Sequence, residues 1–480
     1  VQRDNRHPLA RRCGNRSGQR RVLCQPAIEA GAAGWILLIG LGVAYVISGD
    51  YAGWNFGLAQ GGWGGMFIAT LLMATMYLCM CFSLAELSSM IPTAGGGYGF
   101  TRTAFGPWGG FLTGTAILIE YAIAPAAIAC FIGAYCESLF GIGGWIIYLV
   151  FYVVFIGIHI LGAGEALKLM FAITAVAAIA LGVYIVAMAP HFQVANLFDI
   201  PPTEANGASS FLPMGYIGIW AALPYGIWFF LAVEGVPLAA EETKDPKRDL
   251  PRGLIGAVLV LLVFAGLILL VGPGAAGAQS LVASGNPLVE SLVKVYGGST
   301  WMSQFVNLVG LAGLIASFFS IIYAYSRQIF ALSRAGYLPR SLSLTNRNKA
   351  PVMALIVPGI IGFGLSLTGQ GDLLILVAVF GATVSYVLMM AAHVTLRSRR
   401  PDMPRPYRTP GGVLTSSVAL VLAAVALVAC FLVDLRVVIG AAIIYALFIA
   451  YFALYSRHHL VSGTPEEEFA AIQAAEQSLR

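Results

Sequence analysis

Long apolar stretches recur along the whole chain, and they restrict the fold more than any other feature of the sequence. A helix needs about 20 apolar residues to cross the hydrocarbon core of a bilayer. Inside lipid, backbone polar groups must bond within their own segment, as they do in a helix. Twelve stretches are long enough, near residues 35–60, 64–91, 108–137, 144–162, 166–189, 214–240, 253–275, 301–328, 352–368, 372–396, 413–433 and 436–456. We therefore predict an all-α membrane protein with twelve transmembrane helices.

The composition agrees with this interpretation and excludes several classes of protein. Of the 480 residues, 59% are hydrophobic and 10% are charged, whereas soluble domains carry about 25% charged residues. A soluble enzyme, a disordered chain and a nucleic-acid-binding protein are therefore excluded. The net charge of +5 comes from short basic patches between the apolar stretches. The seven cysteines show neither a disulfide framework nor metal-ligand spacing, so we expect no metal site, no cofactor and no catalytic group.

The distribution of Lys and Arg predicts the orientation, because basic residues concentrate in cytoplasmic loops. With the N-terminus in the cytoplasm, all 27 basic residues except Lys294 and Arg436 fall on the cytoplasmic side. We expect a multi-pass protein of the cell (inner or plasma) membrane with both termini cytoplasmic. The expected organisation is a basic tail over residues 1–34, a membrane domain over 35–456 and a C-terminal tail over 457–480.

Two of the spans contain residues that disfavour a continuous helix. The first holds Ser48-Gly49-Asp50-Tyr51-Ala52-Gly53, and the sixth holds Glu234 and Gly235 followed by Pro237. Irregular backbone at membrane depth persists only where it lines a cavity, and paired breaks in two halves of a chain indicate a binding site. The offset of five spans fits two inverted repeats, about 35–189 and 214–396, followed by two helices over about 413–456. Ordinary glycine packing is the alternative.

Three acidic residues lie inside these apolar spans: Asp50, Glu120 and Glu234. A carboxylate at the middle of a membrane helix costs about 2.5–3.5 kcal/mol on an insertion scale. No Lys or Arg lies in the middle of any span to pair with them. The acids must therefore be protonated, be hydrogen-bonded, or face water or a cationic ligand.

Three further segments resemble motifs of one transporter family. Residues 82–114 read FSLAELSSMIPTAGGGYGFTRTAFGPWGGFLTG, residues 228–253 read WFFLAVEGVPLAAEETKDPKRDLPRG, and residues 323–340 read YAYSRQIFALSRAGYLPR. Together they resemble the amino acid–polyamine–organocation permeases, and the likeness covers roughly residues 35–456. Within that family, ethanolamine permeases are most similar to this chain in three segments, VISGDYAGWNFGLA, GPWGGFLTG and LKLMFAITA.

The resemblance implies a secondary transporter with an inverted-repeat fold, in which helices 1 and 6 are discontinuous and hold the substrate near the midplane. It also implies alternating access, with helices 1, 2, 6 and 7 moving against the rest. Amino-acid-transporting members carry Gly-Ser-Gly in helix 1, where free backbone N–H groups take the substrate carboxylate. Here the stretch is Ser48-Gly49-Asp50, and an acid at that place repels a carboxylate and attracts an ammonium. We therefore expect the imported substrate to be ethanolamine or a similar small cationic amine.

The candidate site follows from this comparison. Asp50 and Glu120 are the expected counter-ions, Trp228 and Phe230 can cap an ammonium by cation–π contact, and backbone groups of helices 1 and 6 can bond a hydroxyl. Core packing is the alternative role for the two aromatic residues. The resemblance assigns a gating role to Glu234. The expected substrate-binding residues are Ile47, Ser48, Gly49, Asp50, Tyr51, Glu120, Trp228, Phe230 and Leu231.

Several alternatives remain at this stage. The coupling ion can be a proton or sodium: the helix-5 Lys of proton-coupled relatives has no counterpart in residues 175–181, and Ser317 and Ser320 can bind sodium with helix-1 carbonyls or simply pack. An amino acid permease of the same superfamily is the closest rival function. A membrane substrate sensor and an intramembrane enzyme are further alternatives.

Overall fold

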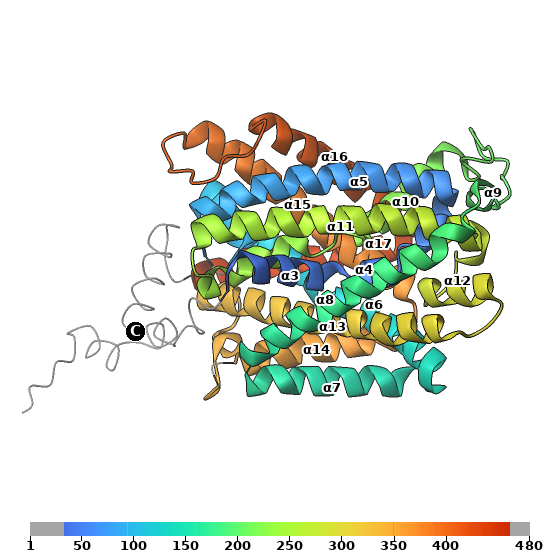
Figure 1. Ribbon diagram of the computed structural model, residues 1–480. Coiled ribbons are helices and arrows are strands. Elements are labelled where there is room, and N and C mark those ends of the chain that lie inside the picture. Colours follow the sequence, from blue (N-terminus) through green and yellow to red (C-terminus); the bar gives the residue numbers. More distant parts are fainter. Residues whose placement is uncertain (1–32, 94, 163, 349, 461–480) are drawn as a thin grey trace, which may run out of the picture.

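The computed structural model describes residues 33–93, 95–162, 164–348 and 350–460, so most of both predicted tails lies outside the described residues. In this part of the chain the structure is helical, and extended pairing is limited to one bridge between Ala33 and Thr243. In Figure 1 the long helices lie side by side, with α9 and α12 at the right.

The helices follow the apolar stretches. The α-helices are α3 (Trp35–Val46), α4 (Ser48–Tyr51), α5 (Phe56–Met90), α6 (Gly97–Phe140), α7 (Trp145–Leu161), α8 (Gly164–Met188), α9 (Val194–Leu197), α10 (Gly215–Trp228), α11 (Pro246–Ala276), α12 (Pro287–Tyr296), α13 (Trp301–Arg334), α14 (Val352–Ser366), α15 (Gly371–Arg399), α16 (Val413–Val433) and α17 (Leu435–Leu454). The 3₁₀ segments are η1 (Ala189–His191), η2 (Val233–Glu242), η3 (Ala278–Ser280), η4 (Arg340–Ser343) and η5 (Ser456–His458).

Each of the twelve predicted stretches lies in this helical structure. Among the described residues, nine helical segments are long and apolar enough to cross a membrane, and three shorter apolar helices are α3, α7 and α14. Helix α3 is short because it ends at Val46, and only the single turn α4 follows before the backbone becomes extended at Ala52, within the predicted break. The chain is therefore an all-helical, multi-pass membrane protein.

Two groups of helices pack most extensively. In the first group, α11 packs along α3 and α5, and α10 packs along α5; these elements correspond to predicted spans 1, 2, 6 and 7. In the second group, α6 packs against α13, α14 and α15. The grouping separates the helices that we expect to move from much of the remaining structure.

The two ends of the bundle differ in charge. We call the end with the start of α3 and the ends of α13 and α15 the basic face, at the left of Figure 1, and the other end the distal face. At the basic face, the backbone N–H of Ala33 donates to the carbonyl of Glu242 at 3.0 Å, and Lys244 N–H donates to Ala33 at 2.9 Å. The Glu242 carboxylate accepts from Arg327 at 2.8 Å and from the Tyr323 hydroxyl at 2.7 Å. The start of α3 and the ends of η2 and α13 therefore meet there.

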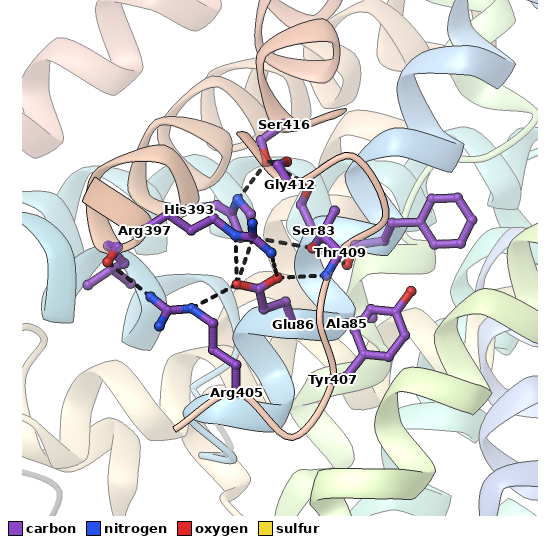
Figure 2. Close-up of polar contacts among 12 residues, drawn as sticks. Ser83, Ala85, Glu86, His393, Arg397, Arg405, Tyr407, Thr409, Gly412 and Ser416 are labelled. Atoms are coloured by element: carbon purple, nitrogen blue, oxygen red, sulfur yellow. Dashed lines mark hydrogen bonds and ion pairs between the residues drawn. The ribbon is translucent and has the colours of Figure 1, made fainter. Parts of the chain in front are cut away.

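A second ionic cluster, which we call the Glu86 cluster, lies at the same face (Figure 2). The buried Glu86 carboxylate on α5 accepts from Arg397 of α15 (Nε at 3.0 Å, Nη2 at 2.5 Å) and from Arg405 Nε at 3.1 Å. The Thr409 backbone N–H donates to it at 2.7 Å, and His393 Nε2 lies 3.4 Å from it. One carboxylate thus connects α5, α15 and the segment before α16.

Candidate functional site

The first predicted helix break is present in the structure. After α3 ends at Val46, α4 forms a single turn over Ser48–Tyr51, and Ala52 is extended (φ −161°, ψ 158°). Gly53 follows with φ +98°, a value that favours glycine. The Asn55 side chain accepts from Gly53 N–H at 3.1 Å and donates to the carbonyls of Leu281 and Ser284 at 2.7 and 2.9 Å. Asn55 therefore ties the break to the loop between α11 and α12.

The second predicted break lies in span 6. Helix α10 ends at Trp228, and the chain continues as turns until η2 begins at Val233. Ala232 has φ +79°, the one positive φ at a non-glycine position among the described residues. Such a backbone conformation costs about 1–3 kcal/mol and persists only when surrounding contacts impose it. Span 6 therefore contains an imposed break beside the first one.

The two breaks touch each other at Gly49 and Trp228. A Cβ atom on Gly49 would lie 2.4 Å from the Trp228 carbonyl oxygen, so only glycine permits this approach. The Trp228 indole N–H donates to the Ala52 carbonyl at 2.9 Å. The edge of its ring system meets Phe131 of α6 at a centroid distance of 6.4 Å. Trp228 is therefore a structural connection between the breaks as well as a candidate ligand residue.

Asp50 is buried at the first break, and the described residues supply no hydrogen-bond partner for it. Its relative exposure is 0%, and neither carboxyl oxygen has a hydrogen-bond partner among the described residues. The neighbouring groups are already used: the Tyr51 hydroxyl donates to the Ala177 carbonyl at 2.8 Å, and Tyr135 donates to the Tyr51 carbonyl at 3.1 Å. A buried acid without partners is costly, so Asp50 lies where a cation or a proton would stabilise it.

Ser317 of α13 bridges the first break. Its hydroxyl donates to the Ala44 carbonyl at 2.7 Å and accepts from the Ser48 N–H at 3.0 Å. In this arrangement the hydroxyl already bonds one of the helix-1 carbonyls that we considered for sodium. The contacts favour a structural role for Ser317 over the sodium alternative.

Glu120 does not join Asp50 but lies against Glu234. Glu120 on α6 and Glu234 on η2 are close enough for their carboxyl charges to interact, and among the described residues neither carboxyl oxygen of Glu120 has a hydrogen-bond partner. Glu234 accepts from the Tyr121 and Tyr386 hydroxyls, each at 3.1 Å. Tyr77 of α5 is hydrogen-bonded to Tyr386 at 2.9 Å. Among the described residues, no Lys or Arg forms an ion pair with either acid.

Comparison with known proteins identifies the family to which this chain belongs. The sequence pattern of the family described as "Amino acid permease" matches residues 34–454 of this chain. The chain belongs to the amino acid permease family. It is accordingly a transporter of the amino acid–polyamine–organocation type.

Individual relatives are distant but cover most of the permease. An uncharacterized transporter of Rhizobium meliloti (strain 1021) is 28% identical over 403 residues, covering 82% of this chain and 85% of the relative. The branched-chain amino acid permease of Bacillus subtilis (strain 168) is 26% identical over 398 residues, covering 78% and 82%. The methylthioribose transporter of the same organism is 26% identical over 392 residues, covering 78% and 81%.

The remaining predicted residues of the permease lie in the same buried region. Ile47, Ser48 and Tyr51 are buried at the first break, and Phe230 and Leu231 are buried at the second. The Phe230 ring packs on Tyr77 at a centroid distance of 5.3 Å, and Tyr77 is hydrogen-bonded to Tyr386, which donates to Glu234.

Sequence reasoning missed several polar residues of this region. Asn55 bonds to the first break, Tyr121 and Tyr386 bond to Glu234, and Tyr77 bonds to Tyr386. Asn55, two residues after Gly53 of the first break, was the one visible signal. The three tyrosines lie in mostly apolar helices, and nothing in their local sequence indicates that their hydroxyl groups form these bonds.

Gly49→Ala is expected to impair the permease by forcing the two breaks apart. The new Cβ would collide with backbone at Trp228, and overpacking of this kind costs about 1–3 kcal/mol. Thermal unfolding in detergent and uptake by reconstituted protein measure the effect. Gly266→Ala in α11 is the matched control, because a Cβ there meets no atom within 4 Å. Equal behaviour of the two variants would contradict the close-approach argument.

Proposed function

We propose that this permease imports ethanolamine or a similarly small cationic amine across the cell membrane by alternating access. The observation that carries the proposal is the buried Asp50 carboxyl group, without a hydrogen-bond partner among the described residues, beside the contact between the two helix breaks. A substrate ammonium would supply the missing partner. A substrate carboxylate would meet a like charge, which in a poorly hydrated site is strongly unfavourable.

The other proposed roles follow from the same geometry. Ile47, Ser48, Gly49, Tyr51 and Leu231 would surround the substrate with backbone of the two breaks. Trp228 would provide an aromatic face, and Phe230 would connect the site to Tyr77 and the acid pair.

The Glu120–Glu234 pair is proposed to be a second place for positive charge. Two carboxylates in contact in a low-dielectric interior repel each other, so the pair needs a proton or a cation between them. Glu120 would remain a counter-ion, and Glu234 would couple η2 to α6 and α15 through Tyr121 and Tyr386. Those links suit a gating role, because α6 and α15 belong to the other helix group.

The orientation proposed from the basic residues makes the basic face cytoplasmic. Contacts at Ala33, Glu242 and Arg327 close that face. A cavity opens instead at the distal face, which would be the external side. The arrangement resembles the stage of alternating access that receives substrate from outside.

The names of relatives support a second candidate function. The relatives include the branched-chain amino acid permease and a D-serine/D-alanine/glycine transporter of Escherichia coli (strain K12), 24% identical over 339 residues. Uptake of a neutral amino acid is therefore the alternative. The methylthioribose transporter instead favours a substrate other than an amino acid, because its named solute has no carboxyl group.

Uptake into proteoliposomes tests the proposal. Labelled ethanolamine should accumulate, and unlabelled ethanolamine should compete better than alanine or arginine. Proton and sodium gradients imposed separately would identify the coupling ion. Accumulation of alanine without ethanolamine would replace the proposed function with amino acid transport.

A further inference from the structure

The distal face contains a cavity outside the region of the helix breaks. Its volume is about 400 Å³, and it lies between the start of α5, α6, α10, the Val282–Gly285 loop and the start of α15. A primary amine of the size of ethanolamine occupies only a fraction of this volume. The cavity is therefore large enough to hold such a molecule with part of its hydration shell.

Asp372 gives the cavity its charge. It lies in the first turn of α15 and is partly buried. Its charge acts on Tyr225 and Cys130, which line the same cavity. In the described part of the chain, no Lys or Arg forms an ion pair with Asp372, and its carboxylate accepts no hydrogen bond.

Aromatic rings form the wall of the cavity towards the helix breaks. Phe56 packs on Phe131 and Tyr225 at centroid distances of 6.2 and 6.3 Å. On its other side Phe131 meets Trp228. One ring, Phe131, therefore separates the cavity from the contact between the two breaks. Aromatic faces beside a carboxylate suit an organic cation, which both attract.

We propose that this cavity is an outer binding site in which a small organic ammonium pairs with Asp372 before it passes Phe131. The proposal rests on the proposed function for the identity of the transported amine, but the cation preference of the cavity comes from its own residues. Asn55 connects the two places: it bonds the first break and also the carbonyls of Leu281 and Ser284, next to the loop that lines the cavity. Asn55 would therefore carry a change in the loop beside the cavity to the first break.

Asp372→Asn tests the outer site in intact cells, where the external concentration is controlled. We expect the KM for external ethanolamine to rise about fivefold, the upper range for a partly hydrated ion pair, with Vmax within about twofold of wild type. Added salt should reduce the difference, because it screens the partly exposed charge of Asp372. An unchanged KM, or a lower Vmax at constant KM, would overturn the proposal.

Two variants separate binding from a structural role of the acid at the start of α15. Asp372→Glu retains the negative charge and should keep the wild-type KM. Glu204→Gln removes an exposed acid from the loop between α9 and α10 and should leave the KM unchanged. A rise in KM for Glu204→Gln equal to that for Asp372→Asn would indicate a general surface-charge effect and would overturn the outer site.

External choline distinguishes failure of the outer site from failure of the proposed function. Choline should inhibit uptake of whichever solute the permease carries, and Asp372→Asn should weaken that inhibition about fivefold. If alanine proves to be the solute, loss of choline inhibition in the variant still supports the outer site. If choline inhibits wild type and variant equally, the outer site is wrong even when ethanolamine is transported.

Discussion

Asp50→Asn is expected to abolish ethanolamine uptake. Two opposite unit charges about 4 Å apart at an effective dielectric of about 20 interact by about 4 kcal/mol, which corresponds to about a thousandfold in kcat/KM. Asn has nearly the size of Asp, and the Asp50 carboxyl oxygens have no partner in the described structure, so the fold should survive. Uptake of labelled ethanolamine over a range of concentrations measures the loss.

The selectivity of the same variant carries further information. Removal of the charge should also remove repulsion of a carboxylate, so alanine should compete better against any residual uptake than it does in wild type. Asp402→Asn is the control, because Asp402 is an exposed acid in the segment after α15. Ethanolamine uptake by Asp50→Asn at the wild-type rate would remove Asp50 from the substrate site.

Much of the backbone architecture was predictable from local sequence. Apolar length located the helical segments, because each segment must satisfy its own backbone in lipid. The glycine–acid combination around Gly49 and Asp50 located the first break, whereas Glu234, Gly235 and Pro237 indicated the second only approximately, since it lies just before them at residues 229–232. These predictions depend only on residues that are neighbours in sequence, which is why they could be made without a structure.

Contacts between distant segments were not predictable in the same way. Glu120 was expected beside Asp50, but the packing of α6 places it against Glu234. The tyrosines that bond Glu234 come from α6 and α15, and nothing in their local sequence indicates that partner. The rotation and depth of each helix decide such pairs, and packing of the whole bundle sets both.

The Glu86 cluster shows the same limit at the basic face. Arg397 and Arg405 entered the sequence analysis only as signals of orientation, and Glu86 only as part of a family motif. The structure brings all three together, with the Thr409 N–H as a further donor (Figure 2). A count of charges on each side of a membrane cannot show that some of them neutralise a single buried carboxylate.

Glu86→Gln is expected to destabilise the permease strongly. The variant leaves Arg397 and Arg405, whose side chains are 22% and 9% exposed, without their carboxylate. Breaking a buried ion pair by removing one partner costs about 3–5 kcal/mol, and the partial exposure of Arg397 places this case near the lower value. The expected result is a lower melting temperature in detergent and less folded protein in the membrane.

Two arginine variants distinguish an effect of the Glu86 cluster from a general effect of basic charge. Arg399 lies in the last turn of α15 and is exposed, so Arg399→Gln should leave the melting temperature unchanged, whereas Arg397→Gln should lower it. Combining Glu86→Gln with Arg397→Gln should cost less than the sum of the two single changes, because each single variant already breaks the same pair. Strict additivity would contradict the pairing, and a stable Glu86→Gln variant would show that water or another acid compensates the arginines.

The cluster joins α5 of the first helix group to α15, which packs in the second, so loss of stability should accompany loss of a defined closed basic face.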